Sequence, residues 1–257
     1  MDPAGAALSI DDPAVRWGEG LFETMRAEGG RAPLLERHLD RLAEASRALD
    51  LAPMPSRGQA RAAVAATLAA IGEGPCRVRL TATPRPTLLV EAAPEEPLPV
   101  GPRAVRAVSV RGAWWPADAG AEYKSLSYAR PRRAQRVAAA AGADHALMLD
   151  AAGRLGEAAL CNAFCAVGDE VITAPAEGLV RGIARARVLE SLPVREEAPS
   201  EEAWRGAREI VLTNAVAGAL AVVEVDGAAV GAGRPGPLAH DLHRILRDLL
   251  GAGAGRG

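Results

Sequence analysis

A segment rich in proline and charge, APEEPLPVGPR at residues 93–103, divides this chain into two parts. Proline lacks the backbone N–H that helix interiors and central strands use, so this segment suits a linker. The pattern of predicted helices and strands restarts after it. The chain has 257 residues, a length that allows two modest domains. We therefore expect a smaller N-terminal domain at residues 1–96 and a larger C-terminal domain at residues 97–257.

Hydrophobic spacing predicts helices and strands in both parts. In the first part we expect helices at 34–51 and 59–71 and strands at 76–82 and 87–92. In the second part we expect a strand at 104–110, a helix at 131–142, hairpins at 145–160 and 163–175, a helix at 181–192, strands at 209–216 and 220–227, and a helix at 238–251. Hairpins and helices mix without strict βαβ alternation, which predicts an α+β fold.

Composition excludes several classes of protein. The formal net charge is −2, so nothing indicates a nucleic-acid partner or an anionic membrane surface. No apolar run approaches membrane-spanning length, and the acidic start, MDPAGAALSIDDP, lacks the basic and apolar regions of a signal peptide. We expect a cytoplasmic protein.

The cysteines and the C-terminal histidines give no metal signal. Cys76, Cys161 and Cys165 lack a second pair at zinc-ligand spacing, and we expect them to be reduced and buried as small apolar residues. His240 and His243 lie on the predicted terminal helix, where we expect a solvated surface. No metal site is expected.

Lys124 is the one lysine among thirty Lys and Arg residues, and it lies in EYKSLSY with the only two tyrosines, Tyr123 and Tyr128. Arginine can replace lysine wherever only positive charge is needed. An ammonium can lose its proton when buried and then act as a nucleophile or base, whereas a guanidinium cannot. Lys124 is therefore a candidate amine nucleophile at a strand end. The alternative is a surface lysine left over from GC-rich coding bias.

Five motifs, in order and spacing, resemble the class IV aminotransferases, which use pyridoxal phosphate. RWGEGLFETMR is similar to the family's Gly-Asp-Gly-x-Phe-Glu-Thr stretch, and HLDRL to its His-Leu-x-Arg-Leu. The others are YKSLSY, GADHALMLDAAGRLGEAALCNAF and GLVRGIAR. The resemblance covers nearly the whole chain. It implies two α+β domains with the cofactor in the cleft between them, an amino-group substrate, and a homodimer or larger assembly.

The resemblance implies specific roles for three charged residues. Lys124 matches the lysine that holds the cofactor as a Schiff base and then moves a proton. Glu157 matches the acid that faces the pyridine nitrogen and keeps it protonated. Arg41 matches the arginine on the phosphate, which a guanidinium can bind through two parallel hydrogen bonds. The alternatives are a solvated hairpin carboxylate for Glu157 and a helix-surface arginine for Arg41.

Other matched residues surround the expected phosphate. Gly182, Ile183 and Ala184 should begin a helix, whose free backbone N–H groups suit a phosphate. The family usually has Thr where Ala184 stands, so a hydroxyl contact is lost there. Thr213 and Asn214 align with another strand end on the phosphate side.

Tyr128 matches a position where many relatives have a tyrosine that donates to the cofactor's ring oxygen. Tyr123 is expected to serve packing.

The motifs leave the reaction open between two enzyme classes. EIVLTNAVAGALAV looks like a stretch common in aminodeoxychorismate lyases, which convert 4-amino-4-deoxychorismate into 4-aminobenzoate and pyruvate for folate synthesis. A branched-chain or D-amino-acid aminotransferase is the alternative, and a non-catalytic ligand-binding or scaffold protein is another. Relatives carry substrate contacts in the region of TATPRPT, which is short here. Arg85 in this loop and Phe22 are the candidate substrate residues.

Overall fold

The protein is described by a computed structural model over residues 8–251, except 53, 117 and 119. The chain forms two compact units. The first contains the residues through Glu96 together with Tyr123–Tyr128, and the second contains Pro97–Glu122 and the chain from Ala129 onward. The segment around Lys124 therefore packs with the first unit, although it follows residue 97 in the sequence.

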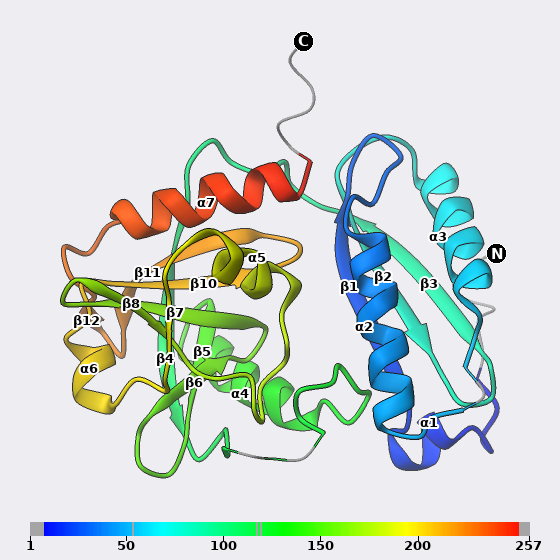
Figure 1. The fold of residues 1–257 in the computed structure, drawn as a ribbon, viewed down its shortest axis with the longest axis horizontal. Coiled ribbons are helices and arrows are strands. Elements are labelled where there is room, and N and C mark those ends of the chain that lie inside the picture. Colours follow the sequence, from blue (N-terminus) through cyan, green and yellow to red (C-terminus); the bar gives the residue numbers. More distant parts are fainter. Residues whose placement is uncertain (1–7, 53, 117, 119, 252–257) are drawn as a thin grey trace. The chain divides into compact units, whose positions relative to one another are not determined.

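The first unit is a three-stranded antiparallel sheet with two long helices (Figure 1). Helix α2 packs on β1, and α3 packs on β3 and β2. Their shared core contains Met25, Leu39, Val64 and Val78, all nearly inaccessible to solvent. The elements are α1 (Pro13–Trp17), β1 (Leu21–Ala27), α2 (Leu35–Ala48), α3 (Arg57–Ile71), β2 (Cys76–Ala82) and β3 (Leu88–Pro94).

The second unit contains a mixed sheet that closes on itself. Strand β10 pairs with both β11 and β7, which closes the order β10-β11-β4-β5-β6-β7. The strands are β4 (Arg103–Arg111), β5 (His145–Leu149), β6 (Leu155–Ala158), β7 (Cys161–Val167), β8 (Glu170–Thr173), β9 (Arg195–Glu196), β10 (Glu209–Asn214), β11 (Gly218–Val225) and β12 (Ala228–Ala229). The helices are α4 (Ala129–Ala140), α5 (Ile183–Ser191), α6 (Glu201–Arg205) and α7 (Pro237–Leu249).

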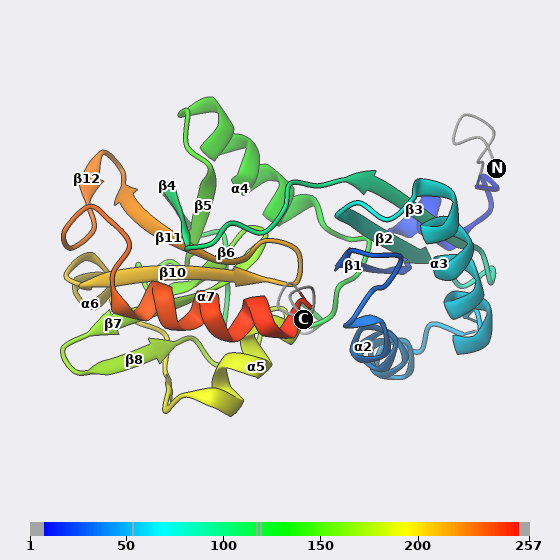
Figure 2. The same cartoon turned by 90° about the horizontal axis from the view of Figure 1, so that it is seen from above.

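Strand alternation separates two sets of side chains in the second unit. One set, which includes Leu147, Cys165 and Leu212, forms a core to which all six strands of the closed sheet contribute. The other set, which includes Phe164 and Val211, packs under α5 and α7. Figure 2 shows α7 running along β10, with α5 beside it.

The predicted α+β class is confirmed, and so are the longer helices and hairpins. Strand β1 was not expected, because its side chains are buried on both faces and LFETMRA shows no alternation. The expectation for His243 was wrong: its ring is buried, and Nε2 lies 3.1 Å from the Pro99 carbonyl oxygen.

The cysteines are confirmed as buried and free, and burial raises the pKa of Cys165 to about 12. Among the described residues, no helix is both long and apolar enough to span a membrane.

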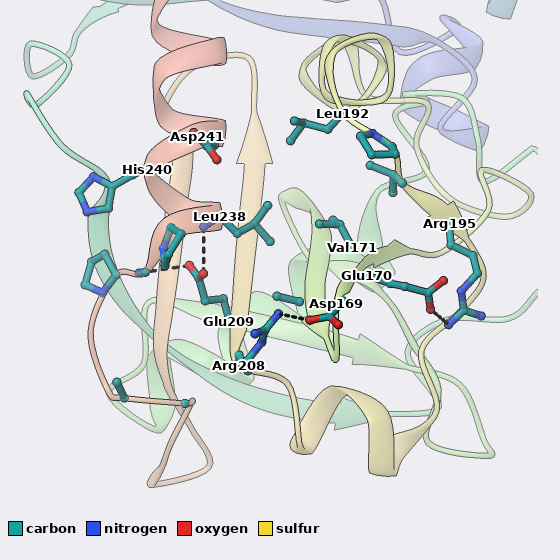
Figure 3. Close-up of a pocket in the computed structure, with 18 of the residues that line it drawn as sticks. Asp169, Glu170, Val171, Leu192, Arg195, Arg208, Glu209, Leu238, His240 and Asp241 are labelled. Atoms are coloured by element: carbon teal, nitrogen blue, oxygen red, sulfur yellow. Dashed lines mark hydrogen bonds and ion pairs between the residues drawn. The ribbon is translucent and has the colours of Figure 1, made fainter.

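Glu209 at the start of β10 caps helix α7 from outside the helix. Its carboxylate accepts hydrogen bonds from the N–H groups of Gly236, Leu238 and Ala239 at 2.9–3.1 Å. Figure 3 shows Glu209 beside Leu238. A carboxylate at this end of a helix also interacts favourably with the helix dipole. The three bonds therefore attach the last helix to the closed sheet.

We expect Glu209→Ala to lower the free energy of unfolding by about 1–3 kcal/mol, because three N–H groups lose an ionised acceptor. Urea denaturation monitored by circular dichroism would measure the loss. Glu177→Ala, at an exposed loop position, is the matched control and should behave like the parent. Equal midpoints for Glu209→Ala and the parent would show that the cap does not stabilise the unit.

Candidate functional site

Lys124 is fixed by backbone hydrogen bonds to the edge of the first unit's sheet. The Phe22 N–H donates to the Lys124 carbonyl oxygen at 2.9 Å, and Ser125 forms a single β-bridge with Leu21. The Leu126 N–H donates to the Gly20 carbonyl oxygen at 2.9 Å. Lys124 itself belongs to no strand, so the expected strand-end position was wrong. These bonds explain why the segment packs with the first unit.

Two aromatic rings surround the Lys124 ammonium. Its Nζ lies 4.2 Å from the ring centroid of Phe22 and 5.3 Å from that of Tyr128. The two rings meet edge to face at 5.1 Å. Such rings attract a cation and also shape a pocket wall. Tyr123 packs against the core of the first unit, which confirms its expected packing role.

Arg79 on β2 is a further cation in this group that the sequence analysis missed. Its guanidinium carbon lies 3.8 Å from the ring centroid of Phe22. Arg79 lies directly opposite Thr24 of β1, and opposite residues point to the same face of the sheet. Phe22 is two residues before Thr24 on the same strand, so its side chain lies on that face as well. In a chain with so many arginines, composition gives no signal for this one. Alternation in CRVRLTA could have placed it on the face away from the core.

Glu23, His38 and Arg41 form a buried charged cluster between β1 and α2. Arg41 donates from Nε to Glu23 Oε1 at 2.9 Å and from a terminal nitrogen to Oε2 at 2.5 Å. His38 Nδ1 lies 2.6 Å from the same Oε2. The Glu23 side chain is only 2% exposed and that of Arg41 12%. Arg41 is thus a partner of a buried carboxylate.

The cluster keeps Glu23 ionised. Burial would raise the pKa of Glu23, but the charge of Arg41 and the hydrogen bonds from His38 and Arg41 outweigh burial and lower this pKa to about 2. Burial also lowers the pKa of His38, against the opposing effect of Glu23. The spacing within HLDRL could have indicated that His38 and Arg41 act together, since residues three apart share a helix face.

Glu157 occupies a buried row of polar side chains in the second unit. It lies opposite Asn162, which in turn lies opposite Thr213, so all three point to one side of the sheet. Glu157 is 8% exposed and Asn162 is 6% exposed. Asn162 Nδ2 donates to Glu157 Oε2 at 3.1 Å. Glu157 is therefore a buried carboxylate, unlike a solvated hairpin residue.

Helix α5 begins beside this row. Gly182 is its N-cap residue, as predicted, and makes no side-chain hydrogen bond to the first turn. The N–H groups of Ile183 and Ala184 open the first turn, where they suit an anion together with the helix dipole. A Cβ on Gly182 would overlap Asn162 Oδ1, so glycine is needed for this close approach.

The chemistry of these groups fits pyridoxal phosphate. The first turn of α5, which begins at a glycine N-cap, suits its phosphate, and the buried Glu157 carboxylate suits its ring nitrogen. Thr213 Oγ1 is buried and has no hydrogen-bond partner among the described residues. In the first unit, Lys124 supplies a primary amine beside aromatic rings.

Asn214 and Arg85 use their side chains locally. Asn214 Oδ1 accepts from the N–H groups of Val216 and Ala217, and its Nδ2 lies 3.2 Å from Cys161 Sγ. It thereby shapes the turn between β10 and β11. Arg85 is exposed in the turn between β2 and β3, with one nitrogen 3.2 Å from Ser9 Oγ. Their assigned roles stay predictions.

A surface hollow of 1410 Å³ lies elsewhere in the second unit, beside the start of α7 (Figure 3). Two pairs of its charged residues are ion pairs, Arg208 with Asp169 and Arg195 with Glu170. None of the candidate cofactor residues is among the described residues that line it. This hollow is therefore separate from the groups described above.

The sequence profile of the amino-transferase class IV family matches residues 20–225, a range that contains Lys124, Glu157 and Arg41. The chain belongs to this family.

Known members of the family differ in activity. A putative branched-chain-amino-acid aminotransferase from Methanocaldococcus jannaschii is 28% identical over 97% of this chain and 93% of its own length. A bifunctional aminodeoxychorismate lyase and D-amino acid transaminase from Mycobacterium tuberculosis is 33% identical, over 60% of this chain and 58% of its own. A fold IV transaminase structure from Curtobacterium pusillum superposes with a TM-score of 0.80 at 26% identity, covering 99% of this chain and 91% of that one.

Proposed function

We propose that this class IV family member is a pyridoxal-phosphate enzyme that converts 4-amino-4-deoxychorismate into 4-aminobenzoate and pyruvate. The main support for cofactor binding is the position of the chain's single lysine, which backbone hydrogen bonds hold beside Phe22 and Tyr128. Both units carry residues that the proposal assigns to the cofactor. Bound pyridoxal phosphate supplies an electron sink for the carbanion that forms beside a substrate amine.

Each residue has a distinct task in this proposal. Lys124 would hold the cofactor through its primary amine, and that amine, when free, would accept the proton beside the substrate nitrogen. Glu157 holds the ring-nitrogen proton. The N–H groups of Ile183 and Ala184 bind the phosphate, and Arg41 adds charge-assisted hydrogen bonds.

Arg79 is our candidate for a substrate carboxylate. It lies against Phe22, as Lys124 does, and the proposed substrate carries two carboxylates. A guanidinium can bind a carboxylate through two parallel hydrogen bonds. Arg79 is proposed in addition to Arg85, which is exposed and contacts Ser9 Oγ.

The lyase reaction is supported by the Thr-Asn-Ala stretch at 213–215, in which Asn214 shapes the turn after β10. The Mycobacterium tuberculosis relative is named as an aminodeoxychorismate lyase as well as a D-amino acid transaminase. A branched-chain or D-amino-acid aminotransferase is the second candidate, favoured by the relative from Methanocaldococcus jannaschii, which matches nearly the whole chain.

Turnover without a keto acid separates the two reactions. In the lyase reaction a proton leaves the carbon beside the amine, the C–O bond to the enolpyruvyl group breaks, and the released enol takes up a proton to become pyruvate. The amine stays on the aromatic product, so no amino acceptor is consumed. We expect purified holoenzyme with 4-amino-4-deoxychorismate alone to release 4-aminobenzoate and pyruvate in equal amounts over many turnovers.

Fluorescence of 4-aminobenzoate and a coupled pyruvate assay would measure both products. Leucine and D-alanine, each with and without 2-oxoglutarate, are the parallel substrates. A protein that is inert to 4-amino-4-deoxychorismate, but converts an amino acid only when the keto acid is present, is an aminotransferase. Protein that takes up no cofactor reducible by borohydride would favour the non-catalytic alternative.

A further inference from the structure

Asn162 links two parts of the candidate cofactor site within the second unit. Its amide nitrogen donates one hydrogen bond to Glu157 Oε2 at 3.1 Å and another to the Val180 carbonyl oxygen at 2.9 Å. Val180 lies two residues before Gly182, where α5 begins. One primary amide has two N–H bonds, and both are used here. The same side chain therefore holds the carboxylate and the turn that leads into the helix.

Burial makes these two bonds important. Asn162 and Glu157 are both more than nine-tenths buried, so water cannot easily replace a lost donor. A hydrogen bond donated to a carboxylate favours its ionised form and fixes its orientation. The other end of the amide, Oδ1, lies so close to Gly182 that a Cβ there would overlap it. Asn162 is thus confined from three directions.

We propose that Asn162 is a positioning residue, which keeps Glu157 ionised and aimed at the cofactor's ring nitrogen and holds the Val180–Gly182 turn in register with it. Asn162 acts through Glu157 and the turn. The proposal rests on the proposed function, because it takes Glu157 to face that nitrogen.

The test compares two probes that differ only at the ring nitrogen: pyridoxal phosphate and its 1-deaza analogue, in which carbon replaces that nitrogen. Asn162→Asp keeps the shape of the side chain, removes the donor and places a second negative charge beside Glu157. We expect the dissociation constant of pyridoxal phosphate to rise about tenfold or more, since a hydrogen bond to a buried charge is lost. The constant for the 1-deaza analogue should change much less.

Two further variants keep the test independent of folding. Asn162→Ser removes the amide without adding charge and should show the same difference between the probes, to a smaller extent. Gly182→Ala adds the methyl group that displaces Asn162 Oδ1. Its effect on the ratio of the two dissociation constants should therefore be less than additive with the effect of Asn162→Asp. Gln135→Glu is the matched control. Gln135 also donates an amide N–H to a carbonyl oxygen, that of Asp144, and its replacement should leave both dissociation constants unchanged.

The outcomes separate this inference from the proposed function. Equal weakening of both probes by Asn162→Asp would overturn the positioning of Glu157, because the residue would then act only on the Val180–Gly182 turn or on folding. Glu157→Gln tests the underlying assignment: if it leaves the affinity for both probes unchanged, Glu157 does not serve the ring nitrogen and the proposed site is wrong. If Glu157→Gln discriminates between the probes and Asn162→Asp does not, only the positioning role fails.

Discussion

Lys124→Arg is expected to abolish the borohydride-reducible absorbance of bound cofactor and to lower turnover by a factor of about 10⁴ or more. A guanidinium stays protonated and cannot attack the cofactor's aldehyde carbon. The change keeps the positive charge beside Phe22 and Tyr128, so lost electrostatics cannot explain the result. Ultraviolet–visible spectra before and after borohydride, together with steady-state rates, would measure both effects.

An exchange variant provides the control. Lys124→Arg combined with Arg79→Lys keeps one lysine and the same charge beside Phe22, but moves the amine to β2. We expect it to remain without reducible absorbance. Full absorbance in the single variant would show that Lys124 is not the attachment point, and recovery in the exchange variant would show that the backbone position of Lys124 is unimportant.

Arg41→Ala is expected to lower the free energy of unfolding by about 3–5 kcal/mol, because it leaves Glu23 buried without its guanidinium partner. Chemical denaturation of the cofactor-free protein would measure this loss.

The acid sensitivity of the parent follows from the same pair. The pKa of Glu23 falls from 4.5 to about 2 on folding, so its contribution is present above pH 4.5 and is lost as the pH falls toward 2.

The double variant Arg41→Ala with Glu23→Gln separates stability from cofactor binding. It removes both charges, so most of the lost stability should return, and the acid-dependent part should disappear. If Arg41 also binds the phosphate, cofactor affinity in the double variant should stay at least about tenfold below that of the parent. Parent-like affinity would restrict Arg41 to its structural pairing with Glu23.

The sequence predicted the elements whose hydrophobic spacing is regular. Helix α2 has a leucine face, and the hairpins β5–β6 and β7–β8 follow turn signals. It missed β1, which is buried on both faces and therefore lacks a period. It also assigned Lys124 to a strand end, because local sequence does not reveal that this segment hydrogen-bonds to β1, a hundred residues earlier in the chain.

The candidate residues illustrate the same division. Lys124, Glu157 and Arg41 could be named from motifs, since each motif is a local pattern. The contacts of these residues could not be predicted from the sequence. The pairing of Arg41 with Glu23, the hydrogen bonds of Asn162 and the position of Arg79 all depend on strand register or on helix packing. Thr213 was noted for its motif, but its buried hydroxyl without a described partner is visible only in the folded chain.

The grouping of Tyr123–Tyr128 with the first unit affects how this protein can be divided into modules. A fragment ending at Glu96 would lack the segment that hydrogen-bonds along the edge of β1, and an uncovered edge strand invites pairing with other chains. A fragment beginning at Pro97 would carry the lysine but not the strand that orders it. Neither half alone would therefore hold Lys124 in the position that the structure shows. Recombination between relatives at residue 97 would preserve the site only where β1 of one parent accepts residues 123–128 of the other.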